Sequence, residues 1–161
     1  MNKFWKIIDW ILDKLKLIGA VSLGGMMLLT CVDVVGRKLD HPILGAVEIV
    51  GFMATIVVAA ALPYTDKIQG HVGVEILVRL FSEKTQIVIN ISTRLLSLGL
   101  FAILTWQMAL YAKTMKESGE VSISLELPEH MIIYATAFCC LVFTLVIIKE
   151  IIDNIKKLKE I

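Results

Sequence analysis

The sequence is poor in charged residues and lacks the patterns that build catalytic sites. Only 19% of its 161 residues are Asp, Glu, Lys or Arg, against about 25% in soluble domains. The 16 basic and 15 acidic residues nearly cancel, so no basic surface for nucleic acid is expected. No Ser/His/Asp set, H-E-x-x-H sequence or phosphate-binding loop occurs. We therefore predict neither an enzyme nor a nucleic-acid-binding protein.

Cysteine and histidine are scarce and poorly placed for ligation. The three cysteines lie in apolar stretches without a Cys-x-x-Cys pair, so we interpret them as small packing residues. The histidines lie in loops or at the ends of apolar stretches, which excludes the axial ligand pair of a haem anchor. They are His41, His71 and His130. We therefore predict no metal and no cofactor.

Apolar residues, in contrast, make up 57% of the chain. They gather in four blocks of about 20 residues, the length that crosses a hydrocarbon core of about 30 Å. The remainder holds no stretch for a separate soluble domain, which needs about 50 residues or more. We therefore predict an all-α membrane protein with one integral membrane domain over residues 1–161 and four transmembrane helices, at about 17–35, 46–62, 87–111 and 131–148.

Two prolines mark expected helix boundaries. The second span is expected to stop at Pro63, because proline cannot continue a helix. Pro128 stands just ahead of the fourth span, at a position that favours helix initiation.

Two segments outside the spans are amphipathic. Over about 3–16, one helical face is apolar, with Phe4, Ile8, Ile11, Leu12 and Leu15. Over about 71–82, polar residues form a stripe, with His71, Glu75, Arg79 and Ser82. We interpret both as helices lying in the membrane interface, with docking onto a partner as the alternative.

The distribution of Lys and Arg predicts the orientation. Eleven lie in the N-terminal stretch, the second loop and the C-terminal tail, and four lie in the first and third loops. By the positive-inside rule both termini face the cytoplasm. The opposite loop, 112–130, is acidic, with Glu117, Glu120, Glu126 and Glu129.

Ionisable residues in the spans need an explanation, because a charge at mid-bilayer costs about 2.5–3.5 kcal/mol on insertion scales. Asp33, Arg37 and Glu48, with Lys38, are expected to form one polar cluster at the outer face. We favour a structural role for this cluster in helix packing over an ion or proton site. Arg94 lies deeper in the third span; it can snorkel to the headgroups, pair with Asp66 or Glu75, or face a partner.

Three functional classes remain open on the residues alone. A homodimeric proton-coupled exporter would use Glu48 as its membrane carboxylate. A membrane anchor would hold a soluble enzyme subunit. A supporting subunit would act with a partner chain, which fits the lack of the broken helices typical of larger secondary transporters.

Three runs of the sequence resemble one family. The run DVVGRKLDHPILGAVEIVGF carries Arg37, Gly45 and Glu48. The run DKIQGHVGVEILVRLF carries Gly70 and His71, and SISLELPEHMIIYATAF carries Ser124, Pro128 and Tyr134. Their order and spacing resemble the small, Q-type (DctQ-like) membrane subunit of TRAP transporters, the tripartite ATP-independent periplasmic transporters. His130 departs from the aromatic residue that the family often has two positions after the proline.

The resemblance implies a function that composition does not. Such a subunit binds a large transmembrane permease subunit, here expected in a 1:1 complex within the lipid of the bacterial inner membrane. A periplasmic substrate-binding protein captures a C4-dicarboxylate, a sialic acid or a similar organic acid, and a sodium gradient drives uptake. The small subunit is expected to hold neither substrate nor sodium itself.

Overall fold

The computed structural model describes residues 2–67 and 83–160, and every long element among them is an α-helix. The helices are α1 (Asn2–Lys38), α2 (Ala46–Lys67), α4 (Glu83–Ser118) and α5 (Glu129–Glu160). All four are long and apolar enough to cross a membrane. This confirms the predicted fold class. A lipid-embedded backbone must satisfy its own N–H and C=O groups, and continuous helices achieve that.

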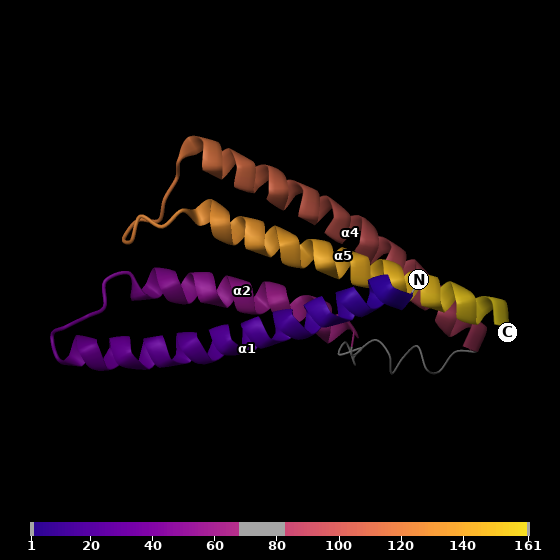
Figure 1. Ribbon diagram of the computed structural model, residues 1–161, viewed down its shortest axis with the longest axis horizontal. Coiled ribbons are helices and arrows are strands. Elements are labelled where there is room, and N and C mark those ends of the chain that lie inside the picture. The colour runs from indigo at the N-terminus through magenta and orange to yellow at the C-terminus, as the bar shows by residue number, and fades with distance from the viewer. Residues whose placement is uncertain (1, 68–82, 161) are drawn as a thin grey trace.

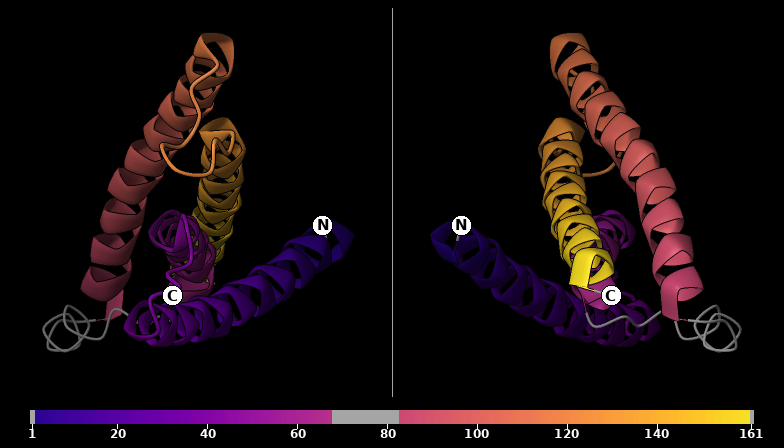
Figure 2. Two further views of the ribbon diagram at one scale, coloured as in Figure 1. Left: turned by 90° about the vertical axis from the view of Figure 1, so that its left-hand side faces the viewer. Right: turned by 90° about the vertical axis from the view of Figure 1, so that its right-hand side faces the viewer.

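The helices form two antiparallel hairpins that meet through α2 and α5. Close contacts join α1 to α2, α2 to α5 and α4 to α5. Consequently α2 and α5 lie between α1 and α4 (Figure 2). Both termini lie at one end of the bundle, called the inner end below, and the α1–α2 and α4–α5 connections lie at the other, the outer end (Figure 1).

Helix α1 joins two segments that we expected to be separate. Its 37 residues run without a break for about 56 Å at 1.5 Å per residue, so residues 3–16 continue the first span. The predicted apolar face is present, but it packs onto the protein. Ile8, Leu12 and Leu15 are buried against Ala59 and Ala60 of α2 and against Cys139, Val142 and Val146 of α5. The N-terminal half of α1 thus builds the core where three helices cross.

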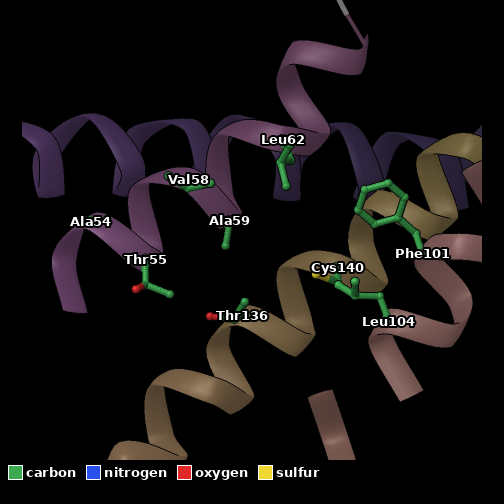
Figure 3. A pocket seen from close by; sticks show the side chains of 9 residues that line it. All are labelled: Ala54, Thr55, Val58, Ala59, Leu62, Phe101, Leu104, Thr136 and Cys140. Carbon is green, nitrogen blue, oxygen red and sulfur yellow. The ribbon is translucent and has the colours of Figure 1, made fainter. Parts of the chain in front are cut away.

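Helix α2 continues through Pro63, contrary to the prediction that it would stop there. Pro63 is fully buried and the helix extends to Lys67. A proline inside a helix removes one backbone hydrogen bond and bends the axis instead of ending it when tertiary packing holds both sides. Figure 3 shows the change of direction beside Leu62. The extra turn carries Asp66 and Lys67, which the predicted boundary left in a loop.

The remaining helices also exceed the expected spans. α4 begins four residues before and ends seven residues after the predicted 87–111, and α5 runs well past residue 148. The residues expected as a second interfacial helix, 71–82, lie outside the described residues. Threonines inside the spans donate their hydroxyl hydrogen to the carbonyl four residues earlier, as Thr55 does to Gly51 at 2.9 Å. Such bonds satisfy a polar group within a helix that faces lipid.

Candidate functional site: polar ties at the two membrane edges

Glu48 holds the connection between α4 and α5. Its carboxylate accepts hydrogen bonds from the Ser122 hydroxyl at 2.8 Å, the Ser124 amide at 2.7 Å and the Leu125 amide at 3.1 Å. Ser122 is buried, and its hydroxyl also accepts from the Leu127 amide at 3.2 Å. Charge-assisted bonds to backbone N–H groups are among the stronger hydrogen bonds. Glu48 and the loop that it binds are called the outer clamp below.

Gly45 completes the outer clamp from the same turn. Its φ of +72° is a left-handed conformation that favours glycine. A Cβ atom placed there would come within about 2.3–2.8 Å of the side-chain carbons of Leu125. The Leu125 side chain therefore occupies the space that a side chain at residue 45 would need. The run that carries Gly45 and Glu48 and the run that carries Ser124 thus meet through two neighbouring contacts, Gly45 with Leu125 and Glu48 with Ser124.

Asp33 organises the turn between α1 and α2. One carboxylate oxygen accepts from Arg37 Nε at 2.8 Å, and the other accepts from the Ile43 amide at 3.1 Å. Asp33 is buried, whereas the Arg37 side chain is 56% exposed. The expected cluster is thus divided: Asp33 and Arg37 pair with each other, and Glu48 bonds to the α4–α5 loop instead.

Arg94 joins three helices at the inner end. Its Nη1 lies 2.5 Å from both carboxylate oxygens of Asp66 on α2, and its Nη2 lies 2.6 Å from Glu150 Oε2 on α5. The guanidinium places one nitrogen against each of the two carboxylates, whereas a lysine offers a single nitrogen. Of the three fates expected for Arg94, pairing with Asp66 is the observed one; Glu75 lies outside the described residues. These three residues are called the inner triad.

A second ion cluster lies next to the inner triad and uses the sequence neighbours of two triad residues. Asp9 of α1 lies 2.9 Å from Lys67 Nζ and 3.4 Å from Lys149 Nζ. Lys67 and Lys149 are the chain neighbours of Asp66 and Glu150. Each of α2 and α5 therefore offers one residue to α4 and an adjacent residue to α1. Together the two clusters tie all four described helices at this level.

The polar ties lie at two levels and leave an apolar zone between them. Glu48 and Asp66 are 18 residues apart in α2, a rise of about 27 Å at 1.5 Å per residue. That separation matches a hydrocarbon core of about 30 Å. The outer clamp and the inner triad thus fit the two edges of the bilayer.

A groove opens between α2 and α4 within the apolar zone, with α5 as its floor (Figure 3). Its volume is about 440 Å³, and its walls are side chains of Ala54, Thr55, Val58, Ala59, Leu62, Phe101, Leu104, Thr136 and Cys140. The hydroxyls of Thr55 and Thr136 both donate to carbonyls of their own helices. Among the described residues, the lining holds no basic side chain that would bind a carboxylate ligand.

Sequence reasoning missed several of these partners. Ser122, Glu150, Asp9 and Lys149 were not expected in the ties, since the α4–α5 loop and the extended helix ends were treated as surface. The signal available was the continuation of helical periodicity past the predicted span ends. Pro128 directly precedes α5, and Gly70 and His71 lie outside the described residues. Within 2–67 and 83–160, no group of three or more His, Cys, Asp or Glu side chains has a metal-site arrangement.

Comparison with known proteins identifies the family. A search of the curated proteins gives no match. A family model described as "Tripartite ATP-independent periplasmic transporters, DctQ component" matches residues 26–157, which include Glu48, Gly45, Arg94 and the α4–α5 loop. The match covers more than half of the chain and agrees with the resemblance in the three signature runs. The chain belongs to the DctQ family, the small membrane component of the tripartite ATP-independent periplasmic transporters.

Proposed function

We propose that this chain is the supporting subunit that holds a large permease subunit in the bacterial inner membrane, in a 1:1 complex. The observation that carries the proposal is the use of the intramembrane charges. Glu48, Asp66, Arg94 and Glu150 are engaged with one another or with a loop at the membrane edges. Charged side chains that pair within the chain are not free to bind a transported molecule, so the transport path is assigned to another chain.

The proposal assigns the transported molecule to the partner. The complex imports an organic acid, such as a C4-dicarboxylate or a sialic acid, delivered by a periplasmic binding protein and driven by sodium. A carboxylate needs cationic or N–H partners when it leaves water. The groove between α2 and α4 has apolar walls and two hydroxyls that are already bonded. It therefore suits helix packing or lipid better than an anionic substrate.

The orientation in this proposal follows from the charges. The inner end carries Lys16, Lys67 and Lys149, besides the C-terminal lysines of the sequence. Basic residues remain on the cytoplasmic side of membrane proteins, which supports cytoplasmic termini and an α4–α5 loop facing the periplasm.

The engagement of Glu48 argues against the exporter alternative. An exporter needs a carboxylate that releases and rebinds protons facing its substrate path. Glu48 instead accepts three hydrogen bonds from a loop of its own chain. Losing them would free the loop, so proton exchange at this site would carry a structural cost.

Co-purification tests the proposal. A tagged chain, expressed with the genes adjacent to its own and solubilised in mild detergent, should co-purify with one equivalent of a much larger membrane protein. Proteoliposomes holding both chains should take up an organic acid only with sodium and the binding protein, and the chain alone should transport nothing. Isolation as a monomer or homodimer, or with a soluble enzyme subunit, would overturn the proposal.

A further inference from the structure

Helix α4 carries two stripes of side chains, and α5 covers one of them. On the covered stripe, Phe101 packs edge-on against Phe143 of α5, with ring centroids 4.4 Å apart. The second stripe runs beside it with alternating spacings of three and four residues, the heptad pattern of a helix seam. It consists of Asn90, Thr93, Ser97, Leu100, Leu104 and Gln107. All six are exposed except Ser97, which is half-buried. This open stripe is therefore a packing surface that the described residues leave without a helix.

The open stripe borders the groove between α2 and α4. Leu104 of the stripe lies in one wall of the groove, and Thr55, Val58 and Leu62 of α2 lie in the other (Figure 3). Val58 is 62% exposed, so the α2 wall is open as well. The two hairpins diverge toward the outer end (Figure 1). The open stripe and the groove together are called the concave face below.

Gln107 places an amide on the concave face at a depth where lipid offers no hydrogen-bond partner. It lies 13 residues after Arg94 and six residues before Lys113, the next charged residue of α4, or about 20 Å and 9 Å along the axis. Its side chain is exposed and makes no hydrogen bond with residues 2–67 or 83–160. Thr93, in contrast, donates to the Ile89 carbonyl of its own helix at 3.0 Å. An unbonded amide is costly in hydrocarbon, and membrane helices use such groups to bond to one another.

We propose that the concave face binds one transmembrane helix of the large permease subunit, and that Gln107 is hydrogen-bonded to that helix. The proposal rests on the proposed function, which supplies the partner. The partner helix is apolar and carries a Ser, Thr, Asn or Gln side chain at the depth of Gln107. The heptad spacing of the open stripe favours a shallow crossing angle of about 20° between that helix and α4.

Two other occupants fit the concave face less well. Acyl chains of lipid can fill the groove, but they have no donor or acceptor for the Gln107 amide. A second copy of the chain would present the same face across a twofold axis, and two concave faces leave space between them. A single helix is convex and about 10 Å across, so it can contact the α2 wall and the open stripe at once.

Photo-crosslinking in the two-subunit complex tests the location. A photoreactive amino acid replaces Leu104 on the concave face or, as the matched control, Ile103, which is 65% exposed. Ile103 is two residues from Phe101, about 200° around the helix, and so faces away from α5. Irradiation should join residue 104 to the large subunit in clearly higher yield than residue 103. An equal or higher yield from residue 103, or adducts of residue 104 with lipid or a second copy alone, would overturn the proposal.

The affinity of the two subunits in mild detergent tests the role of the amide. Gln107→Leu should raise the Kd about 3- to 30-fold, the effect of losing one hydrogen bond between membrane helices. The matched control is Trp106→Leu, at the neighbouring residue, which is 67% exposed on another side of α4; its Kd should be unchanged. Thermal unfolding of the isolated Gln107→Leu chain should match or exceed the wild type, which separates a lost contact from a folding defect. An unchanged Kd for Gln107→Leu contradicts the hydrogen bond.

The outcomes separate this proposal from the supporting role. A large subunit that co-purifies but is crosslinked from residue 103 overturns the concave face as its binding site and leaves the supporting role intact. A preparation without any large subunit overturns the supporting role itself, before any crosslink is measured.

Discussion

Removing Arg94 should destabilise the chain more than removing any surface lysine. The Asp66 side chain is 5% exposed and that of Glu150 is 22% exposed, and both lie against the same guanidinium. Arg94→Met would leave the buried Asp66 carboxylate and the partly buried Glu150 carboxylate without the guanidinium that they share. Breaking a buried pair from one side costs about 3–5 kcal/mol. At about 2–4 °C per kcal/mol for a chain of this size, Tm should fall by about 6–20 °C.

Removing the whole inner triad should cost less than removing its centre. In Arg94→Met/Asp66→Asn/Glu150→Gln, neutral amides replace the two carboxylates. The main penalty of the single variant, negative charge left without its cation, is therefore absent. We expect this triple variant to recover at least half of the lost stability. Arg94→Lys should lie between the two, because a single ammonium nitrogen replaces the two guanidinium nitrogens that face Asp66 of α2 and Glu150 of α5.

The assay is thermal unfolding of the purified chain in detergent, followed by helical circular dichroism. Lys113→Met is the matched control, because Lys113 and Glu117 form an exposed pair at 3.8 Å and such pairs contribute about 0–1 kcal/mol. A Tm for Arg94→Met within about 2 °C of the control, less than 1 kcal/mol at this chain length, would refute the reasoning that the inner triad stabilises the bundle electrostatically. A triple variant less stable than Arg94→Met would refute it as well.

Three further predictions concern other contacts. Gly45→Ala should lower the free energy of unfolding by about 1–2 kcal/mol or more through its left-handed φ alone, whereas Gly99→Ala, with open space around its Cβ position, should be neutral or stabilising. Leu12→Ala should cost about 2–5 kcal/mol and expose the N-terminal half of α1 to trypsin, whereas Ile7→Ala, at a residue 56% exposed, should do neither. Asp33→Ala should destabilise the α1–α2 turn more than Asp33→Asn, which keeps an acceptor for the Ile43 amide; hydrogen exchange of that amide measures the difference.

The sequence was sufficient for the number and type of the helices, because the bilayer demands long apolar stretches. It was also sufficient for the apolar face of residues 3–16. It could not say what covers that face, since periodicity describes one helix and Ala59, Ala60 and Val142 belong to two others. The boundary at Pro63 was wrong because local propensity was given more weight than tertiary packing.

The candidate ties were predictable only in part. Asp33 and Arg37 are four residues apart, so their pairing follows from helix geometry. Glu48 and Ser124 are separated by 76 residues, and nothing in the sequence fixes such a contact. Proximity along the chain suggested that Glu48 would join Asp33. The backbone amides of the α4–α5 loop compete for the same carboxylate, and in the folded chain they lie closer.

The ties across α2 also constrain the order in which the chain can be built into a membrane. α2 leaves the ribosome before α4 and α5, and it carries both Glu48 and Asp66. Ser122 and Glu150 are synthesised later, and Arg94 follows Asp66 by 28 residues. A newly inserted first hairpin therefore holds two acidic groups whose partners do not yet exist. Each unpaired carboxyl group costs free energy at the bilayer edge. Completion of the second hairpin removes that penalty at both edges. A truncated or stalled chain should accordingly be a preferred substrate of membrane proteases, and only a full-length chain should persist.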